Sequence, residues 1–471
     1  MSRALSLDPD RLFPSEARSL RIARELYGTV SELPILSPHG HTDPSWFATN
    51  APFANAAELL VIPDHYLFRM LYSQGVPLER LGIERLDGEK SEADPRAAWK
   101  LFADHYHLFT GTPSRLWLDW VFAEIFHLDV RLASETADLY YDRIERALGE
   151  PGFRPRALFE RFNIEVLATT ESPLDPLESH RAIRQSGWKG RVITSYRPDP
   201  VVDPEYPGFK ENLEKFSEAS GEDLSTYAGY LAAHRNRRSF FREAGATSTD
   251  HGHPTPFTAD LERGEAEALY LKIRSGNFSS QEGELFRGQM LTEMAAMSME
   301  DGMVLQVHPG VHRSHNLEVL KRFGRDKGAD IPVATEYVRN LKPLLDRFGN
   351  EPQLTIILFT LDESSYSREL APLAGHYPAL RLGAPWWFND SPEGLRRFRE
   401  EVTETAGFYN GAGFIDDTRA FLSIPARHDV ARRVDCSFLA RLVAEHRLDE
   451  DEAHELARLL AYDLAKEAYR L

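Results

Sequence analysis

The chain has 471 residues, which exceeds the usual size of a single core but suits an α/β barrel with insertions. Its 73 acidic and 55 basic residues give a net charge of −18, which argues against a nucleic-acid or anionic-membrane surface. A mean hydropathy of −0.42, with no long uncharged apolar stretch, argues against a membrane span. The single cysteine, Cys436, excludes an internal disulfide, and the N-terminus lacks the apolar core of a secretion signal. We therefore expect a cytoplasmic protein.

The first elements in chain order are a helix and a short buried strand. The helix is predicted over residues 15–27, with Ser15 as its N-terminal cap and Gly28 as its stop. The strand at 33–38 leads directly into His39 and His41. A long, mainly helical stretch then runs from about 44 to 162 and includes a helix over 58–74.

After residue 162, short β-type runs alternate with helical segments, which is typical of parallel βαβ units. The runs lie at 164–170, 191–196, 246–249, 303–307, 354–360, 380–384 and 413–415. With 33–38 they make eight strands, the number that closes a (β/α)8 TIM barrel. We expect three parts: residues 1–43 with the N-terminal helix and first strand, 44–162 as a helical insertion subdomain, and 163–471 as the remaining barrel and C-terminal helices.

Polar residues cluster where the predicted strands end, and such barrels place their chemistry at the carboxyl ends of strands. His39 and His41 are two residues apart, so they point to the same face and can grip one divalent ion. Neither of the other two pairs at this spacing follows so clean an apolar strand, and the role of the later pair stays open. These pairs are His105/His107 and His251/His253.

His308 follows the fifth predicted strand, and Asp417 follows the eighth. Together with His39 and His41 they resemble the metal set of the amidohydrolase superfamily, which implies a barrel of the metal-dependent hydrolase type. The resemblance implies that these four residues hold Zn²⁺, with Mn²⁺ or Fe²⁺ as alternatives, and leave a position for water or a substrate oxygen. The sixth strand leads to Asp362 without a histidine, so we expect one metal ion that need not be strictly required.

Within that superfamily, the chain resembles the uronate isomerase (glucuronate isomerase) family over nearly its whole length. The tryptophan-rich run and the last segment are the most specific of the matching segments. These are Asp64-His65-Tyr66 with Arg69, Arg197-Pro198-Asp199, His308-Pro309-Gly310 to Arg313, Trp386-Trp387-Phe388-Asn389-Asp390, and Asp417-Thr418-Arg419-Ala420-Phe421-Leu422-Ser423 with Arg427-His428. The family interconverts D-glucuronate and D-fructuronate, and D-galacturonate and D-tagaturonate. The resemblance therefore implies an aldose–ketose isomerase that acts through an enediol.

The resemblance also implies roles for individual residues. Asp417 is expected to be the proton-transferring base beside the metal, and His308 to serve in catalysis as well as in metal binding. Tyr66 is expected to move or donate a proton at O1 or O2 of the sugar. Arginine offers a bidentate fork for the C6 carboxylate, and aromatic side chains can line the pocket. The candidates for these two tasks are Arg197, Arg419 and Arg313, and His65 and Trp387.

Two other readings stay open. A metal-dependent hydrolase could use the same scaffold, although such enzymes often carry a histidine after the sixth strand. A non-catalytic sugar-acid binder would need the arginines, but not the histidines with Asp417 and Tyr66. Fold alone cannot decide between them, because barrels host many chemistries. For the leading reading we expect a hexuronate substrate, no nucleic-acid or membrane partner, and a homo-oligomer.

Overall fold

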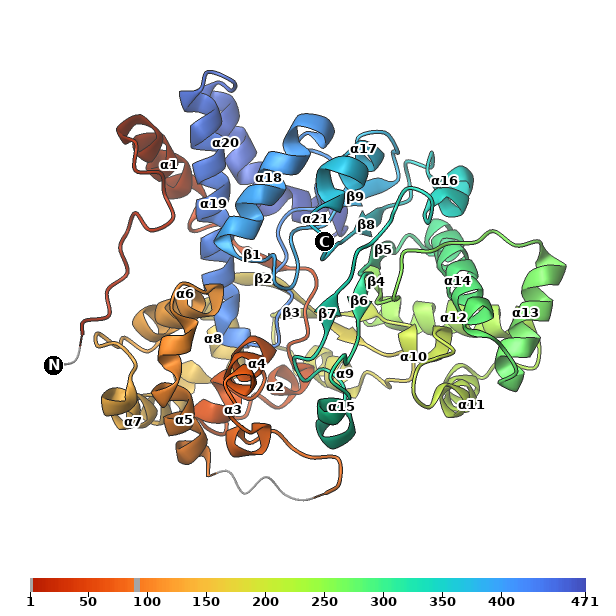
Figure 1. The fold of residues 1–471 in the computed structure, drawn as a ribbon, viewed down its shortest axis with the longest axis horizontal. Coiled ribbons are helices and arrows are strands. Elements are labelled where there is room, and N and C mark those ends of the chain that lie inside the picture. Colours follow the sequence, from red (N-terminus) through yellow and green to blue (C-terminus); the bar gives the residue numbers. More distant parts are fainter. Residues whose placement is uncertain (1–2, 89–93) are drawn as a thin grey trace.

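The computed structural model describes residues 3–88 and 94–471, with a parallel sheet at its centre and helices around it (Figure 1). Within those residues seven strands form the sheet in the order β1-β2-β3-β4-β5-β8-β9, and all neighbouring strands are parallel. The predicted α/β class with parallel strands is therefore confirmed. The strands are β1 (Ile35–Ser37), β2 (Ile164–Glu171), β3 (Arg191–Tyr196), β4 (Ser248–His251), β5 (Val304–Val307), β8 (Ile356–Leu358) and β9 (Leu380–Leu382).

Helices precede, connect and follow these strands. Before β1 lies α1 (Ala17–Val30), and between β1 and β2 lie α2 (Pro44–Thr49), α3 (Ala56–Leu60), α4 (His65–Ser73), α5 (Pro95–Asp104), α6 (Pro113–Trp120), α7 (Ala137–Leu148) and α8 (Pro155–Arg161). The later connections contain α9 (Glu178–Gln185), α10 (Asp199–Val202), α11 (Phe209–Ser220), α12 (Tyr227–Glu243), α13 (Arg263–Ser275), α14 (Ser280–Asp301), α15 (Leu317–Phe323), α16 (Lys342–Phe348) and α17 (Ala371–Ala374). After β9 come α18 (Pro392–Ala406), α19 (Ile424–Ala444), α20 (Glu450–Arg458) and α21 (Leu464–Ala468).

The eighth predicted strand, at 413–415, is wrong as a regular strand. Among the described residues, 413–415 belong to no strand, and the nearest pairing is an isolated β-bridge between Gly411 and Leu382. Gly413 has a φ of +74°, outside the strand region, and packs so tightly on α21 that an added Cβ atom would come within 2.7 Å of its backbone. The segment still bonds to both edges of the sheet. Ala412 donates to the Leu382 carbonyl at 2.8 Å, and His41 donates to the Thr418 carbonyl at 3.1 Å.

The first helix differs from the prediction at both ends, since α1 spans Ala17–Val30. Glu16, not Ser15, caps it, because the Glu16 carboxylate accepts two backbone N–H groups at 2.9 and 2.7 Å. Gly28 does not stop it. Val30 is buried in one cluster with side chains of α19 and α20, and this packing outweighs the low helix preference of glycine.

The helices between β1 and β2 surround a cluster of buried aromatic side chains. The predicted helix over 58–74 is interrupted, because α3 ends at Leu60 and α4 begins at His65. Pro63 lies in the break, and the Asp64 carboxylate caps α4 by accepting the Tyr66 N–H at 2.9 Å. The break brings the first turn of α4 to the carboxyl ends of the strands.

Between β5 and β8 the chain makes an excursion, which we call the 311–332 segment. It begins and ends in an antiparallel pair, β6 (Val311–His312) and β7 (Ile331–Pro332). Leu86 donates to the Arg322 carbonyl at 2.8 Å, and an added Cβ atom on Gly328 would come within 2.7 Å of Arg69 Cβ. The segment therefore packs beside α4. None of the helices in the described ranges is both long and apolar enough to cross a membrane.

Candidate active site

A polar pocket with a cavity volume of about 280 Å³ opens at the carboxyl ends of the strands. Strand ends, α4, the 311–332 segment, the turn at 386–390 and the residues after 416 all contribute to its wall. Every residue that the sequence analysis assigned to catalysis, substrate binding or metal binding lines it. The polar and aromatic lining includes His39, His41, His65, Tyr66, Arg197, His308, Arg313, Arg325, Asp326, Trp386, Trp387, Asp417, Arg419 and Arg427.

One group at the floor of the pocket joins the first strand to the segment after residue 416. The Asp417 carboxylate lies 3.5 Å from His39 Nε2 and 3.3 Å from His41 Nε2. Asp417 has a φ of +36°, a left-handed conformation that a non-glycine residue adopts at some cost. This backbone turn aims its carboxylate at the two imidazoles, and the three side chains offer ligand atoms that suit a divalent cation.

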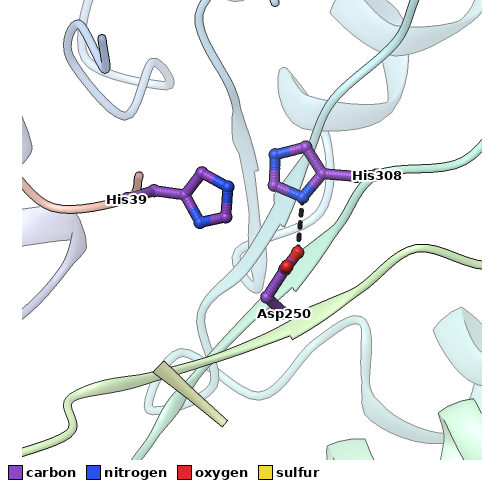
Figure 2. A group of neighbouring side chains, drawn as sticks. All are labelled: His39, Asp250 and His308. Atoms are coloured by element: carbon purple, nitrogen blue, oxygen red, sulfur yellow. Dashed lines mark hydrogen bonds and ion pairs between the residues drawn. The ribbon is translucent and has the colours of Figure 1, made fainter. Parts of the chain in front are cut away.

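A second group shares His39 and adds residues from β4 and from the end of β5 (Figure 2). His308 Nδ1 lies 2.7 Å from Asp250 Oδ1, and the His308 ring stacks on His39 with centroids 4.6 Å apart. Asp250 is completely buried. Because Asp250 engages Nδ1 of His308, the Nε2 atom of that ring is left for another partner. No role was predicted for Asp250 from the sequence.

Four of the pocket arginines face carboxylates of the protein itself. Arg197 is the most constrained, since it pairs with Asp199 at 2.9 Å and with Asp250 at 3.0 Å. The other three pairs are Arg313 with Asp330 at 2.9 Å, Arg419 with Asp326 at 3.5 Å, and Arg427 with Asp390 at 2.7 Å. Arg325 is different. Its guanidinium lies over the Tyr206 ring, 4.5 Å from the centroid, and among the described residues it has no carboxylate partner.

A second part of the pocket wall is built around Tyr66. Its hydroxyl donates to Asp390 Oδ1 at 2.8 Å and accepts the Phe388 N–H at 2.9 Å. His65 packs on Trp387, with ring centroids 4.7 Å apart. This wall therefore combines the first turn of α4 with the turn at 386–390.

The comparisons with known proteins agree with this site. The family model described as glucuronate isomerase matches residues 17–469. The chain belongs to the glucuronate isomerase family. It is 66% identical over 467 residues to a uronate isomerase from Rhizorhabdus wittichii, and the match covers 99% of each protein. A uronate isomerase from Phenylobacterium zucineum is also 66% identical, over all of this chain and 98% of that protein.

Solved structures give the same result. The crystal structure of glucuronate isomerase from Caulobacter crescentus matches with a TM-score of 0.98 and 62% identity, over 99% of this chain and 98% of that one. The uronate isomerase of Thermotoga maritima matches with a TM-score of 0.91 at 28% identity, over 98% and 99%. As a member of this glucuronate isomerase family, the protein is an isomerase.

Burial sets the charges in this glucuronate isomerase family site. Desolvation lowers the pKa of His308 to about 4 and that of His65 to about 3, so both rings are neutral at pH 7. Burial alone would raise the pKa of Asp417. The neighbouring His39 and His41 outweigh it and hold the pKa of that carboxyl well below its usual range. The neutral His308 imidazole and the Asp417 carboxylate are thus in the protonation states that metal binding requires.

The other histidine pairs lie outside the metal groups. His105 Nδ1 bonds to the Leu101 carbonyl at 2.8 Å, in a helical region. His251 and His253 are buried, and His251 Nε2 lies 3.1 Å from Thr249 Oγ1. Within residues 3–88 and 94–471, the His and carboxylate groups that could hold a metal all include His39.

Four residues of this site were given no role from the sequence, although three of them have a sequence signal. Asp390 and Arg427 lie in segments that carry the family resemblance, and Asp250 directly precedes His251 at the end of a predicted strand. Arg325 follows a glycine in a loop, where no local pattern distinguishes it from a solvated arginine. Only the fold brings Arg325 and Arg427 to the pocket wall and places Asp250 and Asp390 behind His308 and Tyr66.

Proposed function

We propose that the protein interconverts D-glucuronate and D-fructuronate, and D-galacturonate and D-tagaturonate, by aldose–ketose isomerisation. The observation that carries the proposal is the presence in one pocket of Asp417, a histidine cluster and several arginines, in a member of the glucuronate isomerase family. The reaction moves a proton from C2 to C1 through an enediol, so it needs a positioned base. It also needs positive charge near the sugar oxygens and near the C6 carboxylate.

The residues at the floor of the pocket fit a divalent cation. His39, His41 and Asp417 present ligand atoms that all lie within 4.8 Å of one another. In the part of the chain that the structure describes, the buried Nε2 atom of His308 has no hydrogen-bond partner, which supports a fourth ligand. We propose Zn²⁺ for this site, with Mn²⁺ or Fe²⁺ as alternatives. When bound, the ion supplies positive charge that stabilises the negative charge developing on the sugar oxygens.

Asp417 is our candidate for the base that takes the C2 proton and returns it at C1. Its side chain is nearly buried and is aimed into the pocket by its left-handed backbone. Asp250 acts indirectly, through a metal ligand, because it orients His308 and is itself held by Arg197. This arrangement uses the charge of Arg197 within the protein, so we assign Arg197 to positioning in addition to any contact with the sugar.

For the C6 carboxylate we propose Arg325 as an anchor alongside Arg419 and Arg313. A cation that has no carboxylate partner in the described structure can pair with a substrate carboxylate without breaking an existing ion pair. The face of Tyr206 holds the Arg325 guanidinium at the pocket wall. Arg419 keeps part of this role, since its contact with Asp326 is long and its side chain is 39% exposed.

Four broader expectations belong to the same proposal. Backbone bonds from residues 412 and 41 to the neighbouring segments support a closed (β/α)8 barrel of the metal-dependent hydrolase type. The run of helices from α2 to α8 supports a separate helical unit at 44–162, between the parts at 1–43 and 163–471. The lone, buried Cys436 is compatible with a reducing cytoplasm. A homo-oligomer stays a prediction.

The proposal is tested by incubating the purified protein and divalent metal with D-glucuronate in D₂O, and following C1 and C2 by proton NMR. The expected result is a ketose product. Solvent deuterium at C1 would demonstrate an exchanging enediol, and its absence would indicate a shielded proton transfer within the same isomerisation. No change with either D-glucuronate or D-galacturonate would contradict the proposal and direct attention to hydrolase substrates.

A further inference from the structure

The hydroxyl of Tyr66 is committed to two partners of the protein. It donates its proton to Asp390 Oδ1 at 2.8 Å, and it accepts the N–H of Phe388 at 2.9 Å. Phe388 has a φ of +68°, a costly conformation for an aromatic residue, and this turn directs its N–H at the phenol oxygen. A phenol has one proton to donate, so the remaining position on the Tyr66 oxygen is a lone pair.

Because Tyr66 lines the pocket, this lone pair is what it can offer to a ligand. Tyr66 can accept a proton from a sugar hydroxyl, but it cannot donate one while its own proton bonds to Asp390. Of the two expected roles of Tyr66, moving or donating a proton at O1 or O2, this geometry favours moving one. It also means that any proton Tyr66 takes up must be matched by release of its own.

Asp390 is held rigidly enough to receive that proton. Its second oxygen pairs with Arg427 at 2.7 Å, and Arg427 is only 3% exposed. The Arg427 guanidinium stacks on Trp117, 3.6 Å from the ring centroid, and its Nε donates to Ser423 Oγ at 3.1 Å. The pair is therefore fixed from several directions, and Asp390 keeps one oxygen for Tyr66.

We infer that Asp390, positioned by Arg427, forms a proton relay with Tyr66 in the proposed isomerisation, on which this inference rests. Once Asp417 has taken the C2 proton, the enediolate carries its charge on O1. The O2–H bond then breaks and its proton bonds to the Tyr66 oxygen, while the original phenol proton moves to Asp390 Oδ1. Asp390 returns its proton to Tyr66 as Tyr66 gives one to O1, and Asp417 then protonates C1 as C2 becomes a carbonyl. The net change is one proton moved from O2 to O1, and no other reactant is needed.

The environment favours such an exchange. Burial raises the pKa of Tyr66 well above its ordinary value, so the phenol is protonated before the reaction. Burial also raises the pKa of Asp390, and the charge of Arg427 only partly offsets this. A carboxylate with a raised pKa accepts the phenol proton more readily than an exposed one would.

A double-mutant cycle tests the relay. We expect Asp390→Asn and Tyr66→Phe each to lower kcat for D-glucuronate by about 10²-fold, the usual contribution of proton transfer, with KM changed by less than about three-fold. The variant that combines both should be no slower than Tyr66→Phe alone, because Asp390 acts only through Tyr66. A merely structural role predicts that the two losses multiply.

Two controls separate the relay from damage to the fold. Asp435→Asn breaks a similar buried pair, Asp435 with Arg399 at 2.6 Å, away from the pocket, and should leave kcat within about two-fold of wild type. Asp390→Leu combined with Arg427→Met removes both charges, so no unpaired charge is buried, and should be as slow as Asp390→Asn. Thermal unfolding and metal content are measured on every variant.

The outcomes are distinguishable. Wild-type turnover together with a nearly normal kcat for Asp390→Asn, or with multiplying losses in the combined variant, overturns the relay and leaves the isomerase function intact. If the Asp390→Asn protein does not fold, the variant that combines Asp390→Leu with Arg427→Met is used instead. A nearly normal kcat in that variant would also overturn the relay. A wild-type protein that converts neither uronate overturns the proposed function and the relay with it.

Discussion

The two halves of the pocket are built in different ways. The strand-end half consists of His39, His41, Asp250, His308 and Asp417. Parallel register places Asp250 beside Gln306, two residues before His308, and the left-handed backbone of Asp417 aims its carboxylate at His39 and His41. The loop half consists of Tyr66, Arg325, Asp390, Arg419 and Trp387, which come from α4, the 311–332 segment and connecting turns. The first half is positioned mainly by the sheet, and the second mainly by ion pairs and ring contacts between loops.

This difference in construction predicts a different task for each half of the pocket. Strand ends are rigid, so they suit metal ligands and a base, which must be held within a fraction of an ångström. Loops and helix ends can be exchanged without disturbing the sheet, so they suit substrate recognition. Replacements in the strand-end half should therefore reduce kcat and metal binding, whereas replacements of recognition residues in the loop half should raise KM.

The largest effect is expected for Asp417→Asn. Loss of the carboxylate removes both the proposed base and a metal ligand, so kcat should fall by about 10³-fold or more, and bound metal should be lost. Kinetics with D-glucuronate and metal analysis by mass spectrometry check both. Asp362→Asn is the matched control: Asp362 follows β8 but accepts the Thr335 N–H at 3.0 Å, and kcat should stay within about three-fold. Equal losses in the two variants would contradict the assignment.

A smaller loss is expected for Asp250→Ala. His308 loses the partner that orients its ring, and Arg197 keeps only Asp199. Metal affinity or kcat should fall by about 10- to 100-fold, the usual effect of removing such a supporting contact. Asp250→Asn keeps an acceptor for the ring and should lose less. Unchanged metal affinity and unchanged kcat in Asp250→Ala would show that His308 is oriented without this carboxylate.

The recognition residues of the loop half should respond in KM. Arg325→Gln is expected to raise KM for D-glucuronate by about ten-fold and to change kcat by less than about three-fold, because an ion pair with the substrate carboxylate is lost. Arg339→Gln, at an exposed position outside the pocket, should leave both constants unchanged. Initial-rate kinetics decide the matter. An unaltered KM in Arg325→Gln would show that Arg325 does not bind the substrate carboxylate. Arg419 and Arg313 would then be its remaining candidate anchors.

The smallest effect on activity is expected at Glu171, where β2 ends in a carboxylate that does not line the pocket. Burial raises its pKa to about 7, above the ordinary value of 4.5. The native state therefore binds this proton more tightly than the unfolded state, so its contribution to stability is present at low pH and is lost as pH rises through about 7.

Glu171→Gln should consequently gain stability relative to wild type as pH rises, by about 3 kcal/mol between pH 4.5 and 8.5. Kcat should change by less than about three-fold. Denaturant unfolding of both proteins at the two pH values measures the difference. A stability difference that is the same at both pH values would mean that Glu171 has an ordinary pKa in the folded protein.

Much of the strand-end half could be predicted from the sequence, because period-two spacing after an apolar strand puts His39 and His41 on one face. Asp250 could not be assigned, since a strand buried on both faces does not show which side chains point inward. The eighth strand was misjudged because only the packing of Gly413 on α21 reveals its left-handed backbone. The Asp390–Arg427 pair joins residues 37 positions apart, which no local pattern encodes.

The division between the two halves is tested most directly by titrating Zn²⁺ into metal-free wild type, His39→Gln and Arg325→Gln by calorimetry. We predict one ion per chain in wild type, the same affinity in Arg325→Gln, and at least about 100-fold weaker binding in His39→Gln. Equal Zn²⁺ affinity in wild type and His39→Gln would contradict the account, because the metal would then bind somewhere other than the strand ends.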